Sequence, residues 1–433
     1  MSSEGPSVEV ERADQGPRVV PKLRFPEFVS SGTWTETPLG ATCEPIQEKV
    51  GGAKLTPVSI TAGHGFVSQA SKFGRDISGD QYRNYIYLKK GDFAYNKGNS
   101  KKFPQGYVCQ LFEFEEAAAS SAFICFRLKG GYEPRFFQAV FDQNTHGRQL
   151  ARYITSGARS DGLLNIRPED FYSVKVALPP KQGEQQKIAA CLSLLDALIS
   201  AEADKLAALK DHKKGLMQQL FPSEGEGTPR LRFPEFQDAG DWQQANLGSF
   251  GKLVTGLTYS PSDVRERGLL VLRSSNIRDG KIDLSDCVYV DPGVRRANKV
   301  KPDDILVCVR NGSTSLIGKN ALIPAGMPRC THGAFMTIFR SSSAKFVFQL
   351  FQTSAYQRQV AADLGATINS INGAQFLKYQ FRFPSNQEQH KISEFLSSID
   401  ALIAAEADKL AGLKDHKKGL MQQLFPPSGE ASV

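Results

Sequence analysis

The chain contains the same stretch of sequence twice, and this repeat constrains its fold more than any other feature. Residues 201–222 read AEADKLAALKDHKKGLMQQLFP, and residues 405–426 repeat them with a single difference. A second element, LRFPEF, occurs at 23–28 and again at 231–236, and each copy precedes a tryptophan and a Leu-Gly pair. The chain is therefore a tandem duplication with a period of about 200 residues.

The segments between the repeated elements, roughly 40–180 and 248–384, have diverged strongly. Phe141, Arg148-Gln149 and Ile154 still align with Phe351, Arg358-Gln359 and Leu364 at one constant offset. We therefore expect two mixed α/β (α+β) modules that share a fold and differ in surface. Divergence confined to the modules favours a protein whose two modules recognise two different targets at a fixed separation. The alternative is that the two copies have diverged by sequence drift alone. Strand-like runs lie at 85–88, 122–127, 305–309 and 335–339, and helical stretches near 136–154 and 346–364.

Composition narrows the class of protein. A length of 433 residues accommodates two domains, and a net charge of +8 favours an anionic partner, most commonly nucleic acid. Seven scattered cysteines without CxxC spacing predict reduced intracellular thiols rather than disulfides or a zinc site. We find neither a membrane-spanning run nor a signal-peptide core.

These features suggest six segments. The boundaries are 1–18 for a disordered tail, 19–183 for the first module, 184–222 for the first conserved helix, 223–383 for a short linker and the second module, 384–426 for the second conserved helix and 427–433 for a C-terminal tail.

Both conserved segments have the alternating four- and three-residue spacing of a coiled-coil seam. Pro222 and Pro426 end the predicted helices, each of which would span about 50 Å. The seam positions are Ile188, Leu192, Leu195, Ile199, Glu202, Leu206, Leu209, Lys213, Leu216 and Leu220 in the first copy, and Ile392, Leu396, Ile399, Ile403, Glu406, Leu410, Leu413, Lys417, Leu420 and Leu424 in the second.

Each seam is interrupted by two charged residues. We expect the helices to pair as an antiparallel coiled coil, with Glu202 opposite Lys417 and Lys213 opposite Glu406, because buried polar residues at seam positions can fix the register. The alternative is that these side chains reach out to solvent. Antiparallel pairing would relate the two modules by a pseudo-twofold axis. The backbone of duplex DNA also has local twofold axes, so such a protein could contact both halves of a DNA site.

Several loops of the modules carry side chains suited to DNA. Arg and Lys can contact guanine or phosphate, Asn can contact adenine, and Ser can bond to either. Each loop alone could be ordinary solvated surface, and the combination of duplication and charge favours DNA. The candidates are Lys97, Asn99, Lys101, Lys102, Arg159, Ser160, Arg273, Ser274, Asn276, Arg310, Asn311, Ser313, Lys319, Asn369, Ser370 and Asn372.

The sequence contains no recognisable active site. The segment 312–320 resembles a phosphate-binding loop, but its spacing is one residue too long and no Ser or Thr follows the lysine. Dinucleotide and nucleophile-elbow motifs are missing, as is the Asn/Asp-Pro-Pro-aromatic motif of amino-methyltransferases. The histidines lack metal-ligand spacing. We therefore expect a chain that binds and does not catalyse, with no metal of its own.

The pattern as a whole resembles the specificity subunits of type I restriction-modification systems. The resemblance rests on the Glu-Gln-x-Lys-Ile entry into each conserved helix, the Lys-Lys-Gly-Leu-Met-Gln-Gln-Leu-Phe-Pro exit, and the aromatic-Pro-Glu-Phe…Trp…Leu-Gly start of each module. This ordered set occurs twice and covers essentially the whole chain.

The resemblance implies that each module is a target recognition domain that reads one half of a bipartite, asymmetric DNA target. It implies two modification subunits that methylate adenine at N6, and it is compatible with two restriction subunits that join them. S-adenosylmethionine, ATP and Mg would be bound by those partners and no cofactor by this chain, in the cytosol of a bacterium or archaeon. The helices would set an unread gap of about six base pairs in a target of about 13–15.

Two other functions fit the same residues. A stand-alone bivalent DNA-binding protein would need no partner, and a non-catalytic scaffold would bind proteins and carry its charge incidentally. Salt-dependent DNA affinity separates the scaffold from the others. A requirement for a methyltransferase separates the specificity subunit from the stand-alone binder.

Overall fold

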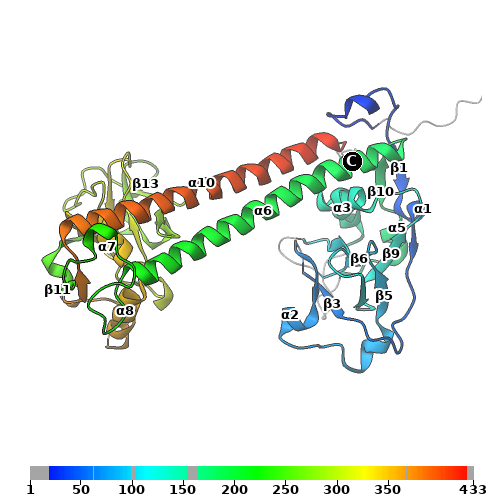
Figure 1. The fold of residues 1–433 in the computed structure, drawn as a ribbon. Coiled ribbons are helices and arrows are strands. Elements are labelled where there is room, and N and C mark those ends of the chain that lie inside the picture. Colours follow the sequence, from blue (N-terminus) through cyan, green and yellow to red (C-terminus); the bar gives the residue numbers. More distant parts are fainter. Residues whose placement is uncertain (1–18, 62, 99–102, 155–163, 367–368, 427–433) are drawn as a thin grey trace, which may run out of the picture. The chain divides into compact units, whose positions relative to one another are not determined.

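Two helices of 39 residues each dominate the computed structural model: α6 (Gln182–Leu220) and α10 (Asn386–Leu424). Figure 1 shows both helices as continuous ribbons. Contacts divide the chain into two units, and the division falls inside both helices. Unit 1 combines 1–202 with 409–433, whereas unit 2 is the continuous stretch 203–408. The structure describes residues 19–61, 63–98, 103–154, 164–366 and 369–426.

Unit 1 contains two four-stranded sheets, in the orders β2-β9-β6-β7 and β4-β3-β8-β5, and the antiparallel pair β1-β10. The pairing of β3 with β8 is parallel and the other pairings are antiparallel. Its strands are β1 (Thr35–Pro38), β2 (Cys43–Pro45), β3 (Pro57–Thr61), β4 (Gly65–Ser68), β5 (Ile86–Lys89), β6 (Phe93–Asn96), β7 (Tyr107–Gln110), β8 (Glu116–Ala119), β9 (Ile124–Leu128) and β10 (Lys175–Leu178), and its short helices are α1 (Leu39–Thr42), α2 (Gln69–Phe73), α3 (Pro134–Asp142), α4 (Thr145–Leu150) and α5 (Pro168–Tyr172).

Unit 2 repeats this plan with sheets β12-β21-β18-β19 and β13-β17-β14-β20 and the pair β11-β22. Its parallel pair is β14-β20. A further pair, β15-β16, completes the unit. The strands are β11 (Gln243–Asn246), β12 (Lys252–Thr255), β13 (Val264–Arg265), β14 (Leu269–Leu272), β15 (Ile277–Arg278), β16 (Lys281–Ile282), β17 (Val288–Val290), β18 (Ile305–Cys308), β19 (Asn320–Leu322), β20 (Cys330–His332), β21 (Met336–Arg340) and β22 (Gln380–Phe383), and the helices are α7 (Ala344–Leu350), α8 (Ser354–Ala366) and α9 (Gly373–Phe376).

The mixed α/β composition and the shared fold of the two modules are confirmed. Each expected strand-like run overlaps a strand, namely β5, β9, β18 and β21. Each expected helical stretch is present but divided in two, as α3–α4 and α7–α8. Phe141 and Phe351, which align between the copies, are buried in the two main cores.

The end of α10 completes the core of unit 1. The Phe425 ring lies 6.2 Å from the Trp34 ring and 5.3 Å from the Phe136 ring, measured between centroids. The amide of Leu23 donates to the carbonyl of Gln423 at 2.9 Å. The repeated LRFPEF element thus lies against the repeated helix end.

Unit 2 uses the end of α6 for the same purpose. Phe221 lies 6.1 Å from Trp242 and 5.6 Å from Phe346, between ring centroids. The amide of Leu231 donates to Gln219 at 2.9 Å. The repeated elements therefore form the same contact in both units.

A buried ion pair joins each LRFPEF element to the start of a long helix. The Arg24 guanidinium donates to Glu184 at 2.8 Å, and the Trp34 indole donates to the same carboxylate at 3.3 Å. The pair Arg232–Glu388 repeats this contact at 2.8 Å. The four charged side chains are 1–9% exposed, and removing one partner of such a pair typically costs about 3–5 kcal/mol.

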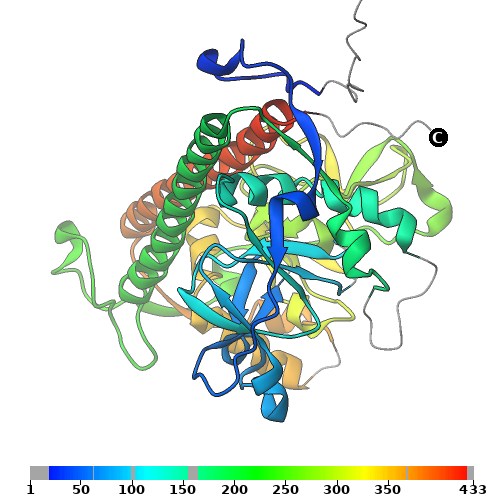
Figure 2. The ribbon, with the colours of Figure 1, turned by 90° about the vertical axis from the view of Figure 1, so that its right-hand side faces the viewer.

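The predicted seam faces inward. Every seam position of α6 and α10 is buried or half-buried. In unit 1 the beginning of α6 and the end of α10 lie side by side in two perpendicular views (Figures 1 and 2). Ile188, Leu192 and Leu424 belong to one buried cluster. In unit 2 Ile392, Leu396 and Leu220 belong to a second buried cluster.

The helices run antiparallel within each unit, but the predicted charge pairs are wrong. Glu202 accepts from Lys409, not Lys417, and Lys417 donates to Asp196. These partners are six to eight residues from the expected ones, so the register differs by one heptad.

Unit 2 has the same offset. Lys213 donates to Asp400 at 2.6 Å instead of to Glu406, and Glu406 accepts from Lys205 at 2.5 Å. Each charged seam residue meets a residue that flanks the partner's seam, so apolar seam residues remain opposite one another.

The helix ends explain this register. Ile188 and Leu424 lie near opposite ends of the paired segments and share one core. In the expected register Ile188 would lie beyond the end of α10 and lose its apolar partner. Burying such a side chain contributes about 1.5–3 kcal/mol, more than a half-exposed ion pair, so the apolar ends determine the alignment.

Candidate nucleic-acid interface

In unit 2 the candidate residues apart from Lys319 gather at one edge of a sheet. Because β14 and β20 are parallel, their carboxyl ends lie at the same edge. Arg273 and Ser274 follow β14, and the turn 333–335 follows β20. The amide of Gly333 donates to the carbonyl of Leu272 at 3.0 Å, and this hydrogen bond joins the segments that follow the two strands.

Two further segments reach this edge. After β18, the amides of Val309 and Arg310 both donate to the carbonyl of Phe335, at 3.0 and 3.1 Å. The amide of Ile371 donates to Val309 at 2.8 Å, and Arg310 forms a β-bridge with Ser370. Four segments distant in sequence therefore meet. We call them the unit 2 loop cluster: 273–276, 310–315, 333–335 and 369–372.

Side-chain hydrogen bonds hold the cluster together. The Asn311 amide donates to the Ser274 hydroxyl at 3.0 Å, and the Asn311 side-chain oxygen accepts from the amide of Ser313. Asn372 caps α9 by accepting from the amide of Ala374 at 2.8 Å. Asn311 and Asn372 thus shape the loops as well as lining them.

The charged candidates of unit 2 keep their side chains accessible. Arg310 and Lys319 are exposed. The Arg273 guanidinium is partly exposed and pairs with Asp286 at 2.8 Å. Asn369 has φ of 52°, a left-handed conformation that asparagine tolerates better than most residues.

The prediction for Asn276 is wrong. Its side chain is 0% exposed and accepts from the amide of Arg273 at 2.9 Å. Its amide group donates to the carbonyls of Asp283 and Asp286, at 2.9 and 2.8 Å. Asn276 therefore holds the loop beneath the surface and cannot contact DNA.

Unit 1 presents the corresponding edge. Its parallel strands β3 and β8 end together, and Lys97 follows β6 as Val309 follows β18. The amide of Leu164 donates to the carbonyl of Lys97 at 2.9 Å, which matches the bond between Ile371 and Val309. The other candidates of unit 1, Asn99, Lys101, Lys102, Arg159 and Ser160, lie outside the described residues.

A buried imidazole supports the unit 2 loop cluster from below. His332 ends β20, and its Nε2 lies 2.9 Å from the carbonyl of Val254. Burial lowers the pKa of His332, and the hydrogen bond to Val254 partly offsets this. A neutral ring is therefore favoured there, so it adds no positive charge to the surface.

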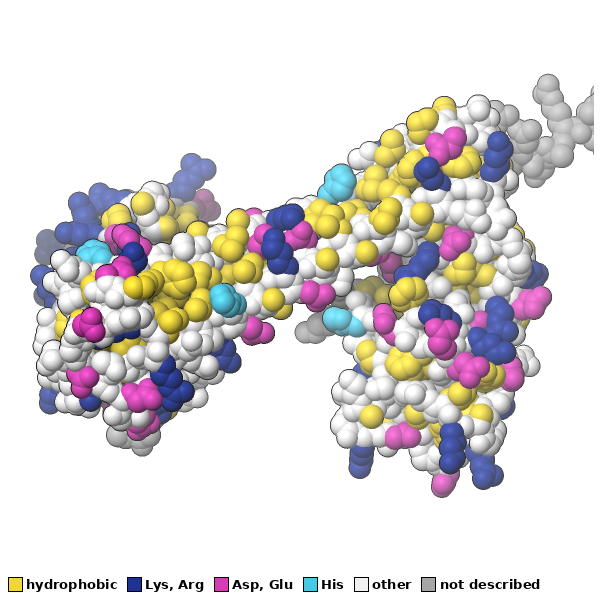
Figure 3. Space-filling view, viewed as in Figure 1, with side chains coloured by type: hydrophobic (Ala, Val, Ile, Leu, Met, Phe, Trp, Pro, Cys, Tyr) yellow, Lys and Arg dark blue, Asp and Glu magenta, His cyan; other side chains and the backbone are white. Residues whose placement is uncertain are grey.

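Sequence reasoning missed one residue of the cluster and a set of basic residues elsewhere. Phe335 is 58% exposed, and the Arg310 guanidinium lies 5.9 Å from its ring centroid. Exposed arginines and lysines also lie at the end of β13 and after β13 and β17, and Figure 3 shows many such side chains over unit 2. The sequence runs VRER (264–267) and VRRANK (294–299) could have indicated these basic residues. The residues are Arg265, Arg267, Arg295, Arg296 and Lys299.

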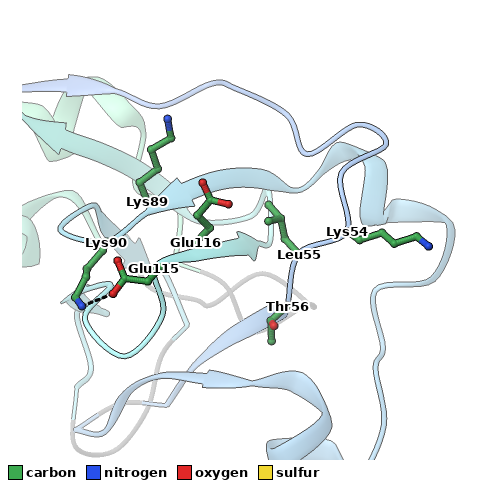
Figure 4. Close-up of a pocket in the computed structure, with 7 residues that line it drawn as sticks. All are labelled: Lys54, Leu55, Thr56, Lys89, Lys90, Glu115 and Glu116. Atoms are coloured by element: carbon green, nitrogen blue, oxygen red, sulfur yellow. Dashed lines mark hydrogen bonds and ion pairs between the residues drawn. The ribbon is translucent and has the colours of Figure 1, made fainter.

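A shallow depression of about 550 Å³ in unit 1 does not belong to this interface. Thr56 and Glu116 lie where β3 and β8 begin, at the end of these strands opposite the loops. Figure 4 shows Lys90 joined to Glu115, with Lys54 and Lys89 pointing in different directions. Its charges are mixed and do not converge.

Within the described residues, no group of three His, Cys, Asp or Glu side chains is arranged to hold a metal ion. None of the helices in these parts of the chain combines the length and apolar character needed to cross a bilayer.

Fold and candidate site together define a protein of two modules built on one framework. Each unit presents loops at the carboxyl ends of equivalent strands, on the same framework with different side chains. The chain belongs to the family of the type I restriction modification DNA specificity domain, whose family model matches residues 69–211 and 239–415.

Relatives agree with this family. The type I restriction enzyme StySPI specificity subunit of Salmonella potsdam is 29% identical over 194 residues, 42% of each chain. The MjaVIII specificity subunit of Methanocaldococcus jannaschii is 25% identical over 287 residues, 63% of this chain and 66% of that one. The match with StySPI thus spans less than half of that protein.

Solved structures share the fold. A type I restriction-modification S subunit from M. genitalium has a TM-score of 0.61 at 14% identity, covering 94% of this chain and 99% of that one. A chain from a type I R-M system has a TM-score of 0.52 at 18% identity, covering 92% and 98%.

Proposed function

We propose that this chain is the specificity subunit of a type I restriction-modification complex. Each unit reads one half of a bipartite, asymmetric DNA target through its loop cluster. Adenine-N6 methylation is carried out by two modification subunits, which bind S-adenosylmethionine. Two restriction subunits that use ATP and Mg join the complex in the cytosol. This chain binds DNA and catalyses nothing itself.

One observation carries this proposal: the same framework occurs twice with different loops. In unit 2, Arg310 and Ser313 are exposed beside the partly exposed Ser274 and Asn311, a combination of donors and acceptors suited to base edges. Lys97 occupies the equivalent edge in unit 1. Two copies of one framework with different loops suit two different half-sites.

We propose further that α6 and α10 form an antiparallel coiled coil that sets the gap between the half-sites. The buried seams and the interhelical pairs, such as Lys213–Asp400, support this. Charged residues at seam positions specify register in coiled coils. The gap then depends on helix length, since each residue adds about 1.5 Å.

The same helices offer a docking surface for the modification subunits. Leu194 is 75% exposed and Leu198 44% exposed on α6, and Leu402 is 46% exposed on α10. Leu198 and Leu402 occupy the same position in the two repeats. An apolar residue exposed at both copies suits one partner surface used twice.

The first experiment is co-expression with the cognate modification subunit in a host without adenine methylation, followed by single-molecule methylome sequencing. We expect a split, asymmetric motif with one N6-methyladenine on each strand. Arg310→Ala should alter only one half of the motif, and Lys345→Ala, an exposed control, should alter neither. An intact complex that methylates nothing would favour a stand-alone binder or scaffold.

Docking is tested by the mass of the purified complex. Leu198→Glu and Leu402→Glu should each remove one modification subunit, and the double variant should remove both. Lys210→Glu, on an exposed part of α6, is the matched control. Unchanged stoichiometry in the double variant would contradict this docking surface.

A further inference from the structure

Phe335 is an apolar residue in a polar setting. It is the most exposed large apolar side chain in the described part of unit 2, at 58%. A single exposed apolar residue is ordinary on a protein surface. The position of Phe335 is not ordinary, because it lies within the unit 2 loop cluster among Arg310, Asn311 and Ser274.

The backbone beneath the ring is fixed from several directions. The carbonyl of Phe335 accepts from Val309 and Arg310, and the amide of Ala334 donates to Leu257 at 2.9 Å. A Cβ placed on Gly256 would lie 2.1 Å from the carbonyl oxygen of Gly333, so the chain under the turn admits no side chain. The ring is therefore presented from a rigid turn, which lowers the entropy cost of using it as a contact.

The neighbours of the ring indicate what it contacts. The Arg310 guanidinium, 5.9 Å from the ring centroid, provides the charge that attracts DNA. The hydroxyls and amides around it can bond to polar base atoms. In the major groove the thymine C5-methyl is the apolar group that distinguishes one base from the others, and phenylalanine is among the side chains that contact it.

We propose that Phe335 reads a thymine through its C5-methyl group in the half-site bound by unit 2. This inference rests on the proposed function, because it presupposes that unit 2 binds DNA at this edge. It specifies one base pair of the target, a T·A pair in the half-site bound by unit 2. It also specifies the group that is recognised, the thymine methyl, which Phe335 contacts beside Arg310.

Unit 1 differs at this point. Phe123 occupies the corresponding turn, between β8 and β9. Its side chain is partly buried and packs against the cluster that contains Ile60 and Leu88. The ring of unit 1 therefore belongs to the core, and methyl reading by this turn is confined to unit 2.

Replacement of thymine by deoxyuridine tests the proposal, because it removes only the methyl group. The assembled complex with its modification subunits is titrated with duplexes in which each thymine of the target is replaced in turn. For the wild-type chain we expect about a fourfold loss of affinity at one position of the unit 2 half-site, which corresponds to ~0.8 kcal/mol for one buried methyl. Phe335→Ala should bind both duplexes equally.

The controls separate this contact from general effects. Phe73→Ala removes a ring that is 46% exposed in unit 1, and it should leave the thymine-to-uracil difference unchanged. Equal melting temperatures of Phe335→Ala and wild type would confirm that the fold is intact. The proposal is overturned if the wild type is insensitive to uracil throughout the unit 2 half-site, or if Phe335→Ala keeps the sensitivity. A complex that methylates no split motif would instead refute the proposed function.

Discussion

At the residue scale, His146 is a buried histidine in the core of unit 1, and its protonation state affects the stability of that unit. It is 1% exposed, and its ring packs edge-on against Tyr95 and Phe141, at 6.2 and 5.5 Å between centroids. Burial lowers the pKa of His146 to about 4, and a backbone contact with Gly106 partly offsets this. The equivalent position in unit 2 is Tyr356, which cannot become cationic.

This pKa predicts a dependence of stability on pH. Because the folded-state pKa lies below the unfolded value of about 6.5, the stabilisation is complete above that pH and is lost as the pH falls toward 4. We expect the unfolding free energy of unit 1 to fall by about 2 kcal/mol between pH 7.5 and pH 5 through this residue. Denaturant unfolding at both pH values measures it.

The variant His146→Phe isolates this contribution, since Tyr356 indicates that an aromatic ring fits here. It should lose the His146 part of the pH dependence. His212→Phe, at an exposed position of α6, should behave as the wild type does. If His146→Phe kept the full dependence, other groups would be responsible.

Asn276 allows a second residue-scale prediction. Asn276→Ala would leave the amide of Arg273 and two carbonyls without their partner, at a cost of about 1–3 kcal/mol. Thermal unfolding should show a lower melting temperature for unit 2. Ser313→Ala, on the exposed surface of the same cluster, should remain within about 0.5 kcal/mol of the wild type.

The sequence could not separate these residues. Asn276 and Asn311 both lie in polar loops, and asparagine serves equally well as a loop brace or as a base contact. Only the folded loop 273–286, whose backbone bonds to the side chain of Asn276, reveals that this asparagine points inward. Phe335 escaped notice for a related reason, since an aromatic residue at the start of a strand is typical of a core.

At the element scale, the long helices were predictable and their register was not. Seam spacing and the prolines located α6 and α10 to within about two residues. A heptad repeat, however, permits several alignments that differ by whole heptads. The alignment depends on where the helix ends meet the cores of Trp34 and Trp242, and the sequence of the helices does not contain that information.

Charge exchange tests the observed register. Glu202→Lys places two lysines together and should destabilise unit 1, and adding Lys409→Glu should restore about 1 kcal/mol, as expected for a partly exposed pair. Adding Lys417→Glu instead should give no rescue, because Lys417 pairs with Asp196. Unfolding free energies of the four proteins measure the coupling. Rescue by the second combination would reinstate the register expected from the sequence.

At the scale of the whole molecule, duplication was the most reliable signal. The repeat predicted two modules of one fold and two long helices, and both are present. The loops could be predicted only by type, because their partners come from distant segments. For Asn99, Lys101, Lys102, Arg159 and Ser160 the sequence remains the available guide.

The proposed spacer makes a quantitative prediction. Inserting seven residues at equivalent places in α6 and α10 preserves the seam and adds about 10 Å to each helix. At about 3.4 Å per base pair the unread gap should grow by about three base pairs. Methylome sequencing would show both half-motifs unchanged and farther apart. An insertion in one helix alone should abolish methylation, because the two helices would differ in length and their ends could no longer both meet the cores of the two units.

Unit 1 is made of two separate pieces of chain, whereas unit 2 is one continuous piece. This difference determines the order in which the two units can finish folding during synthesis. A ribosome completes residues 203–408 as one stretch, so unit 2 can fold as it emerges. Trp34 is synthesised much earlier, yet it is covered by Phe425. The first module must therefore wait, with an aromatic surface open to chaperones, until nearly the whole chain has been translated. Unit 1 begins first and is finished last.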